Sequence, residues 1–265
     1  MGRRQFPLAA VLAVAALAAI GQPLAARSPR LTLVSAPAPV FPEGTSRVGE
    51  GALLFRPPGP ANGSRPLLVL FNGAGGSARR MLDGMIPEAR RCACLLLAIA
   101  SRGTTWDLVT AMRAARGREG PARLDSLFGD DAGRVERALS SLLASPIVDR
   151  RGVVLIGFSD GASYALSLAL ANPHLVRGVV AIAPGFHLEP DTIDPSQRLF
   201  IAHSPEDQIL SFATSRDRIA GSLRNAGFDP AFHAYRGGHI VDPATVALGV
   251  NHVLGRAPPA ATADR

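Results

Sequence analysis

The stretch VVLIGFSDG, residues 153–161, decides how the rest of the sequence is interpreted. Its first four residues form a short apolar run, which is typical of a buried β-strand. Gly157 and Gly161 flank Ser159, and apolar residues in helical spacing follow from Ala162. We therefore expect a strand, a sharp turn and a helix, with the Ser159 hydroxyl raised above the sheet at the amino end of the helix.

Similar apolar runs predict the other strands. They cover Leu67–Phe71, Leu95–Ala98, Val179–Ile182, Leu199–Ala202 and Ala231–Tyr235. Segments of helical period separate them, including Val135–Leu143 after a candidate cap at Asp131, and Phe212–Leu223 before Gly227. This alternation predicts an α/β protein with a doubly wound, mostly parallel sheet and helices on both faces. Residues 102–130 show the least pattern and are expected to form a loop over the sheet edge.

Two residues much later in the chain, Asp207 and His239, complete with Ser159 a set suited to nucleophilic catalysis. Asp207 lies in a loop beyond a predicted strand, and His239 follows two glycines before the last predicted helix. A serine hydroxyl is a poor nucleophile until a base takes its proton, and a carboxylate must orient that base. We therefore predict that Ser159, Asp207 and His239 form a catalytic triad.

A glycine-rich turn, Asn72–Ser77, follows the first of these strands. Its glycines allow backbone amides to face a reacting oxygen, so the amides of Ala74 and Asp160 are expected to form an oxyanion hole. The turn lacks the lysine and the spacing of a phosphate-binding P-loop. The Asp160 side chain has three roles open to it: an ion pair, a helix cap or a substrate contact.

With these residues in view, the chain resembles the α/β-hydrolase superfamily. More narrowly, it is similar to bacterial predicted esterases related to phospholipase/carboxylesterase and dienelactone hydrolase proteins. The resemblance covers residues 48–255 and is carried by Ser101–Asp107, Gly157–Ser163, Ala183–Phe186 and the pair Gly238 and His239. It implies the α/β-hydrolase fold and a serine hydrolase that cleaves esters or thioesters through an acyl-enzyme on Ser159.

The resemblance has two departures and leaves alternatives. Asn72 stands where the family usually has a histidine before glycine, and Ser204 stands where glycine commonly follows His203. A depolymerase or a peptidase could use the same triad, and a catalytically inactive binding protein could keep the same scaffold. The expected partner is a small-molecule ester, and the mechanism requires no metal and no organic cofactor.

Several other residues have two interpretations each. Trp106 and Arg102 are expected near the carboxyl edge of the sheet, where they would bind substrate or serve in packing. Cys92 and Cys94 are either small core residues or an oxidised pair.

Composition limits the class of protein. The chain has 265 residues, of which 47% are hydrophobic and 18% charged, so it can bury one large core. The net charge is +7, from 28 basic and 21 acidic residues, and every one of the basic residues is an arginine, since lysine is absent from the sequence. These arginines are scattered without interleaved aromatic residues, which does not favour nucleic-acid binding.

The two ends of the chain are expected to lie outside the hydrolase domain. Residues 1–26 combine Arg3 and Arg4 with an apolar run of 15 residues and a small-residue stretch, as in a cleaved export signal. The paired arginines resemble a twin-arginine signal, and the run is too short for a stable membrane anchor, which predicts a periplasmic or secreted protein. Residues 27–47 are expected to be an extended linker, and residues 256–265 a flexible tail.

Overall fold

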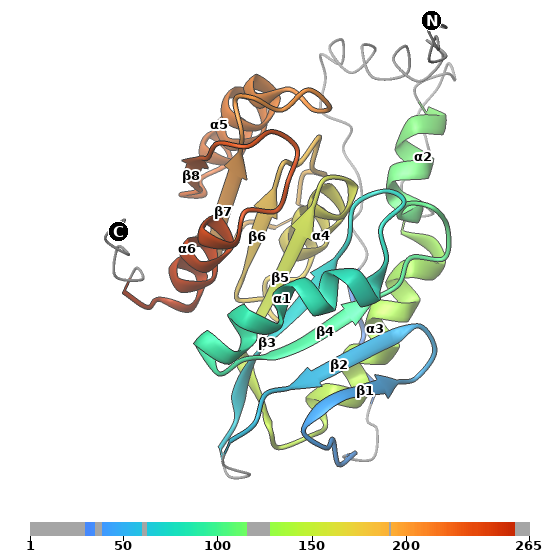
Figure 1. Ribbon diagram of the computed structural model, residues 1–265. Helices are drawn as coiled ribbons and strands as arrows, with labels where there is room; N and C mark the ends of the chain where they lie inside the picture. The colour runs from blue at the N-terminus through green and yellow to red at the C-terminus, as the bar shows by residue number, and fades with distance from the viewer. Residues whose placement is uncertain (1–29, 35–38, 60–62, 116–127, 191, 258–265) are drawn as a thin grey trace, which may run out of the picture.

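The computed structural model describes residues 30–34, 39–59, 63–115, 128–190 and 192–257. They form an eight-stranded sheet with the order β1-β2-β4-β3-β5-β6-β7-β8 (Figure 1). The strands are β1 (Gly44–Val48), β2 (Ala52–Arg56), β3 (Arg65–Phe71), β4 (Leu95–Ile99), β5 (Val148–Phe158), β6 (Gly178–Ile182), β7 (Arg198–His203) and β8 (Ala231–Ala234). From β4 through β3 to β8 each strand is parallel to its neighbours, whereas β2 pairs antiparallel with both β1 and β4.

The helices cover both faces of this sheet, as predicted. They are α1 (Ala78–Cys92), α2 (Asp107–Ala115), α3 (Gly129–Leu143), α4 (Asp160–Ala171), the π-helical segment η4 (Thr214–Ile219), α5 (Ala220–Asn225) and α6 (Pro243–Leu254). Residues Leu67 and Val69 of β3 face a core shared with α2, α3, α4 and α5, while Leu68 and Leu70 face a second core shared with α1 and α6. Figure 1 shows α1 and α6 together on one face. Alternate strand residues thus build two separate cores.

The parallel strands bring the candidate residues to one edge. The turn after β3, Ser159 after β5 and Asp207 after β7 all follow carboxyl ends of strands. In open α/β sheets this edge is where ligands bind.

The structure corrects three expectations at the level of elements. The predicted linker contributes β1, because the antiparallel edge of the sheet needs a partner strand. The same segment contains a buried Phe41, and the amide of Leu31 donates to Asn172. The predicted loop 102–130 contains α2 and the start of α3. Asp131 does not cap α3; it lies inside the first turn and accepts the amides of Arg102 and Asp107.

The predicted export signal, residues 1–26, lies outside the described residues, as does the tail from residue 258. Within the described ranges, no helix has the length and apolar character needed to cross a membrane. Of the two interpretations of Cys92 and Cys94, the structure has the oxidised pair: both are buried between α1 and β4 and joined by a disulfide.

Candidate active site

Ser159 occupies a strained turn between β5 and α4. Its backbone has φ 56° and ψ −122°, a region that residues with a side chain rarely adopt. A Cβ on Gly157 would overlap the main chain of Gly161, and a Cβ on Gly161 would overlap the carbonyl of Phe71. The Ser159 amide also donates to the Ile182 carbonyl at 2.9 Å. Main-chain packing therefore fixes the position of Ser159.

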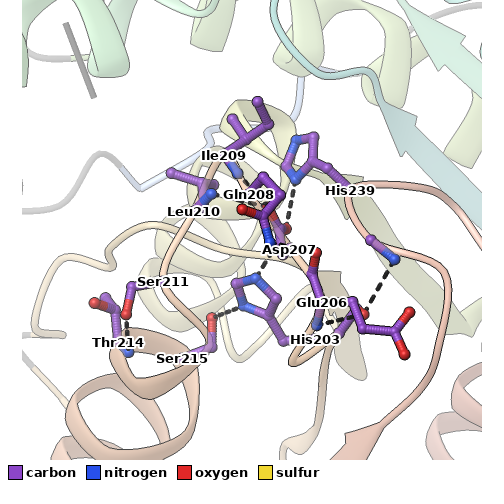
Figure 2. A network of polar contacts seen from close by, with 12 residues as sticks. His203, Glu206, Asp207, Gln208, Ile209, Leu210, Ser211, Thr214, Ser215 and His239 are labelled. Carbon is purple, nitrogen blue, oxygen red and sulfur yellow. Dashed lines mark hydrogen bonds and ion pairs between the residues drawn. The ribbon is translucent and has the colours of Figure 1, made fainter. Parts of the chain in front are cut away.

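Asp207 and His239 are joined by a short hydrogen bond. Oδ2 of Asp207 lies 2.6 Å from Nδ1 of His239, which is in the loop between β8 and α6 (Figure 2). The Asp207 side chain is fully buried, and its Oδ1 accepts the amides of Ile209 at 2.7 Å and Leu210 at 2.9 Å. Burial raises the pKa of Asp207, but the hydrogen bonds from His239 and from the two amides outweigh it, so this pKa lies below its ordinary value. Because Asp207 is ionised at neutral pH, His239 must donate through Nδ1.

The loops that carry Asp207 and His239 are tied to each other. The Gly237 amide donates to Oε2 of Glu206 at 2.9 Å, and the Gly238 amide donates to Oγ of Ser204 at 3.2 Å. The Ser204 hydroxyl also accepts the Glu206 amide at 3.1 Å. Ser204, a departure from the family pattern, thus supplies a bridge that a glycine could not.

Phe158 lies between the two halves of the site. It precedes Ser159, and its ring centroid is 4.7 Å from that of His239. Within the described part of the chain, the Ser159 hydroxyl has no hydrogen-bond partner. Bonds between a nucleophile and its base are often long before substrate binds and tighten in the complex. The structure thus joins Asp207 to His239 and brings Ser159 next to the residue that contacts His239.

The turn after β3 packs against Ser159. A Cβ at Gly73 would lie 3.1 Å from Cβ of Ser159, closer than ordinary contacts allow. The Gly76 amide donates to the Gly73 carbonyl at 3.0 Å and closes the turn. Among the described residues, the amides of Ala74 and Asp160 meet no acceptor. Both amides are therefore available to an anionic oxygen.

Asn72 supports this turn from below. It is buried, and its Nδ2 donates to the Gly73 carbonyl at 2.9 Å. Its Oδ1 is buried with no partner among the described residues. Asn72 therefore stabilises the turn through its hydrogen bond to Gly73. The family that the chain resembles usually has a histidine at this position.

Trp106 takes the packing role that was its alternative to substrate binding. It is fully buried, stacks on Tyr164 at 4.7 Å between ring centroids, and donates Nε1 to the main-chain oxygen of Asn72 at 2.8 Å. Arg102 is exposed and pairs with Asp130, and its contact with substrate stays a prediction.

Asp160 takes the ion-pair role among its three options. Its Oδ2 accepts the Thr105 hydroxyl at 2.6 Å and lies 3.1 Å from Nη2 of Arg113. Sequence reasoning missed Arg113, since α2 was not predicted. It also did not place the ring of His203 against Asp207; the available signal was a histidine at a strand end four residues before the aspartate.

A pocket of about 710 Å³ opens between α1 and α6. Gly73, Ala74 and Phe158 line the part nearest the Ser159 turn. Most of the remaining lining is apolar, with Met81, Met85, Val241, Val246 and Ala247 among it. The pocket therefore joins the candidate oxyanion turn to an apolar surface.

Solved structures share this architecture. The carboxylesterase of Bacillus cereus matches with a TM-score of 0.56 at 20% identity, over 77% of this chain and 93% of that one. The carboxylesterase of Mesorhizobium loti matches with a TM-score of 0.52 at 17% identity, over 80% and 100%. YahD, solved with malic acid, matches with a TM-score of 0.56 at 17% identity, also over 80% and 100%. The chain has the α/β-hydrolase fold.

Sequence comparison points the same way for part of the chain. The phospholipase/carboxylesterase family model matches residues 123–250, a segment that contains Ser159, Asp207 and His239. No curated protein matches the sequence. Because these three solved structures are at most 20% identical to the chain, they establish the fold alone, and the chemistry must be argued from the site.

Proposed function

We propose that this α/β-hydrolase is a serine esterase that cleaves carboxylic esters or thioesters through an acyl-enzyme on Ser159. The observation that carries the proposal is the 2.6 Å bond between Asp207 and His239 beside the strained Ser159 turn. The family match over residues 123–250 and the fold both support ester hydrolysis.

Proton transfer follows from the tautomer of His239. Nδ1 of His239 carries a proton and donates it in the hydrogen bond to Asp207. Nε2 of His239 is therefore free of a proton and is the base that accepts the Ser159 proton. Oγ of Ser159 then attacks the acyl carbonyl, and the charge of Asp207 stabilises the imidazolium that forms. His239 returns this proton to the leaving alcohol or thiol.

The oxyanion that forms during attack needs donors, which the amides of Ala74 and Asp160 would supply. The Asp160 amide is at the amino end of α4, where the helix dipole also favours negative charge. Water then attacks the acyl-enzyme, with His239 as base again, and releases the acid.

The pocket between α1 and α6 supports an apolar acyl group. Phe158 and Gly73 connect it to the turn that carries Ser159, and Met81 and Met85 extend it along α1. Burying acyl methylenes there contributes about 0.8 kcal/mol each. We therefore expect kcat/KM to rise with chain length from acetyl toward longer acyl groups.

A panel of chromogenic esters with acyl chains of increasing length tests the activity. Wild type should release acid from these esters and should react at Ser159 with a fluorophosphonate probe, while Ser159→Ala should do neither. Faster cleavage of a polyester or a peptide than of every simple ester would favour the depolymerase or peptidase alternative. An unreactive Ser159 in folded protein would favour an inactive binding protein.

We also propose that the protein is exported, on the basis of Arg3, Arg4 and the apolar run that follows. The mature chain should begin near Arg27, and replacing both arginines by lysine should leave precursor in the cytoplasm. Amino-terminal sequencing of exported protein that begins at Met1 would contradict this proposal. If only the paired arginines prove dispensable, export follows the general secretory route.

A further inference from the structure

His203 is a second imidazole on the carboxylate that orients His239. It ends β7, its side chain is fully buried, and its Nε2 lies 2.9 Å from Oδ2 of Asp207. Its Nδ1 lies 2.7 Å from Oγ of Ser215, and the Ser215 hydroxyl donates to the carbonyl of Pro184 at 2.8 Å. Figure 2 shows the resulting chain from Ser215 through His203 and Asp207 to His239.

The protons in this chain can be assigned from its chemistry. Asp207 is ionised and can only accept, so Nε2 of His203 must carry a proton and donate it. Burial lowers the pKa of His203, and the attraction of Asp207 offsets this only in part, so the ring is neutral at neutral pH. A neutral ring leaves Nδ1 without a proton, so the single proton of the Ser215 hydroxyl faces two acceptors, Nδ1 of His203 and the Pro184 carbonyl. Asp207 therefore favours the tautomer that points the one N–H of His203 at it, while the Ser215 hydroxyl contacts the opposite side of the ring and fixes its orientation.

The carboxylate of Asp207 is consequently held by four donors. Oδ2 accepts from His203 and His239, while Oδ1 accepts from the amides of Ile209 and Leu210. With every donor in place, the carboxylate has one orientation, and Oδ2 stays directed at His239. Two titratable groups act on His203 in this arrangement: Asp207, which it contacts directly, and His239, on the other side of the Asp207 carboxylate.

The backbone supports the network at some cost. Ser215 belongs to the π-helical segment η4, a type of turn that is rare and occurs often at functional sites. Pro184 follows Ala183, whose φ of 52° is unfavourable for a residue with a side chain. A buried polar network is also expensive unless each member is paired, so apolar residues would be the simpler filling.

We propose that His203 is a positioning residue for the triad and that Ser215 holds its ring in place. The proposal rests on the esterase function proposed above, but the geometry of the network can be measured without catalysis. His203 competes with His239 for Oδ2, so it both orients the carboxylate and draws off part of its charge.

Three variants and one control test the proposal. His203→Leu should lower kcat on a short chromogenic ester about 10- to 100-fold with little change in KM, because a mobile Asp207 misplaces His239. The acid limb of kcat/KM against pH should move up by about half a unit to one unit, since Asp207 then acts on His239 alone. His203→Gln should recover most of the rate, because its side-chain amide can donate to Asp207, and Ser215→Ala should show a smaller loss. The control, His233→Gln on neighbouring β8, should match wild type.

Imidazole N–H resonances of ¹⁵N-histidine protein separate this proposal from the proposed function. Wild type should show two strongly downfield N–H protons bound to Asp207; His203→Leu should lose one, and Asp207→Asn should shift both. Two such protons in a protein that cleaves no ester would overturn the esterase and leave the positioning of Asp207 intact. Wild-type kcat and an unmoved acid limb in folded His203→Leu would overturn the proposal. If that variant does not fold, Ser215→Ala decides, and a wild-type kcat with an unmoved acid limb in Ser215→Ala overturns the proposal.

Discussion

The two halves of the candidate site are held by different kinds of contact. On the nucleophile side, Ser159 is placed by the main chain, with Gly157 and Gly161 packed so closely that neither can carry a side chain. On the acid–base side, Asp207 and His239 are in separate loops, and each hydrogen bond between these loops has a side chain as at least one partner.

This difference separates two ways of failing. Main-chain packing has no intermediate arrangement, so a change there should disturb the local fold. Side-chain hydrogen bonds can be removed singly, so a change there should leave a folded protein with a displaced base. Among the described residues, Phe158 links the two halves through its contact with His239, so the two halves can be perturbed separately.

Removing a group from either half should abolish catalysis to a similar extent, which tests whether the halves act as one unit. We expect Ser159→Ala and His239→Ala each to lower kcat by about 10⁴- to 10⁶-fold, with the double variant scarcely worse. Asp207→Asn should cost about 10⁴-fold, because it leaves the imidazole in the wrong tautomer. Steady-state kinetics on an activated ester measures these losses. Near wild-type turnover in folded His239→Ala would refute its assignment as base.

The nucleophile side should be sensitive to the smallest steric change. Gly161→Ala places a methyl group onto the carbonyl of Phe71, and we expect it to destabilise the fold by about 3 kcal/mol or more, or to prevent folding. Gly221→Ala is the matched control, because a Cβ there meets nothing within 4 Å. It should be neutral or stabilising by about 0.5–1 kcal/mol, since alanine favours helix. Thermal unfolding compares the two, and equal stability would contradict the packing argument.

These two sides also differ in how far sequence predicts them. The strand, turn and helix around Ser159 are a local pattern, so their residues and boundaries follow from neighbours in the chain. The bridge from Ser204 to Gly238 spans 34 positions, and its partners meet only because β7 and β8 pair in parallel. Trp106 shows the same limit: its loop was placed correctly at the sheet edge, but whether its ring points outward or into the core depends on contacts with Tyr164 from α4.

On the acid–base side, removing one bridge should slow catalysis without unfolding the protein. Ser204→Ala deletes the acceptor of the Gly238 and Glu206 amides, so we expect kcat to fall about tenfold and stability to fall by about 1 kcal/mol. Ser196→Ala provides the control, because the Ser196 hydroxyl is exposed and bonds only to Asp194. An unchanged kcat in Ser204→Ala would mean that the His239 loop is held without this bridge.

Mild acid should loosen the acid–base side, because the buried side chains of His203 and Asp207 lie there. Burial lowers the pKa of His203 below that of an unfolded histidine, about 6.5, so the unfolded chain binds more protons as pH falls through that value. Stability should therefore decline from about pH 6.5 downward. The depressed pKa of Asp207 acts only further down, below about pH 4, where the unfolded carboxyl protonates first.

Burial also lowers the pKa of His187 to about 4, and this residue lies outside the triad network. His187→Gln should therefore flatten the decline as His203→Gln does, but without any change in kcat. Unfolding temperatures at pH 7 and pH 5 measure the slope, with the exposed His174→Gln as control. A slope in His203→Gln equal to that of wild type would show that His203 is not the buried neutral imidazole required on this side of the site.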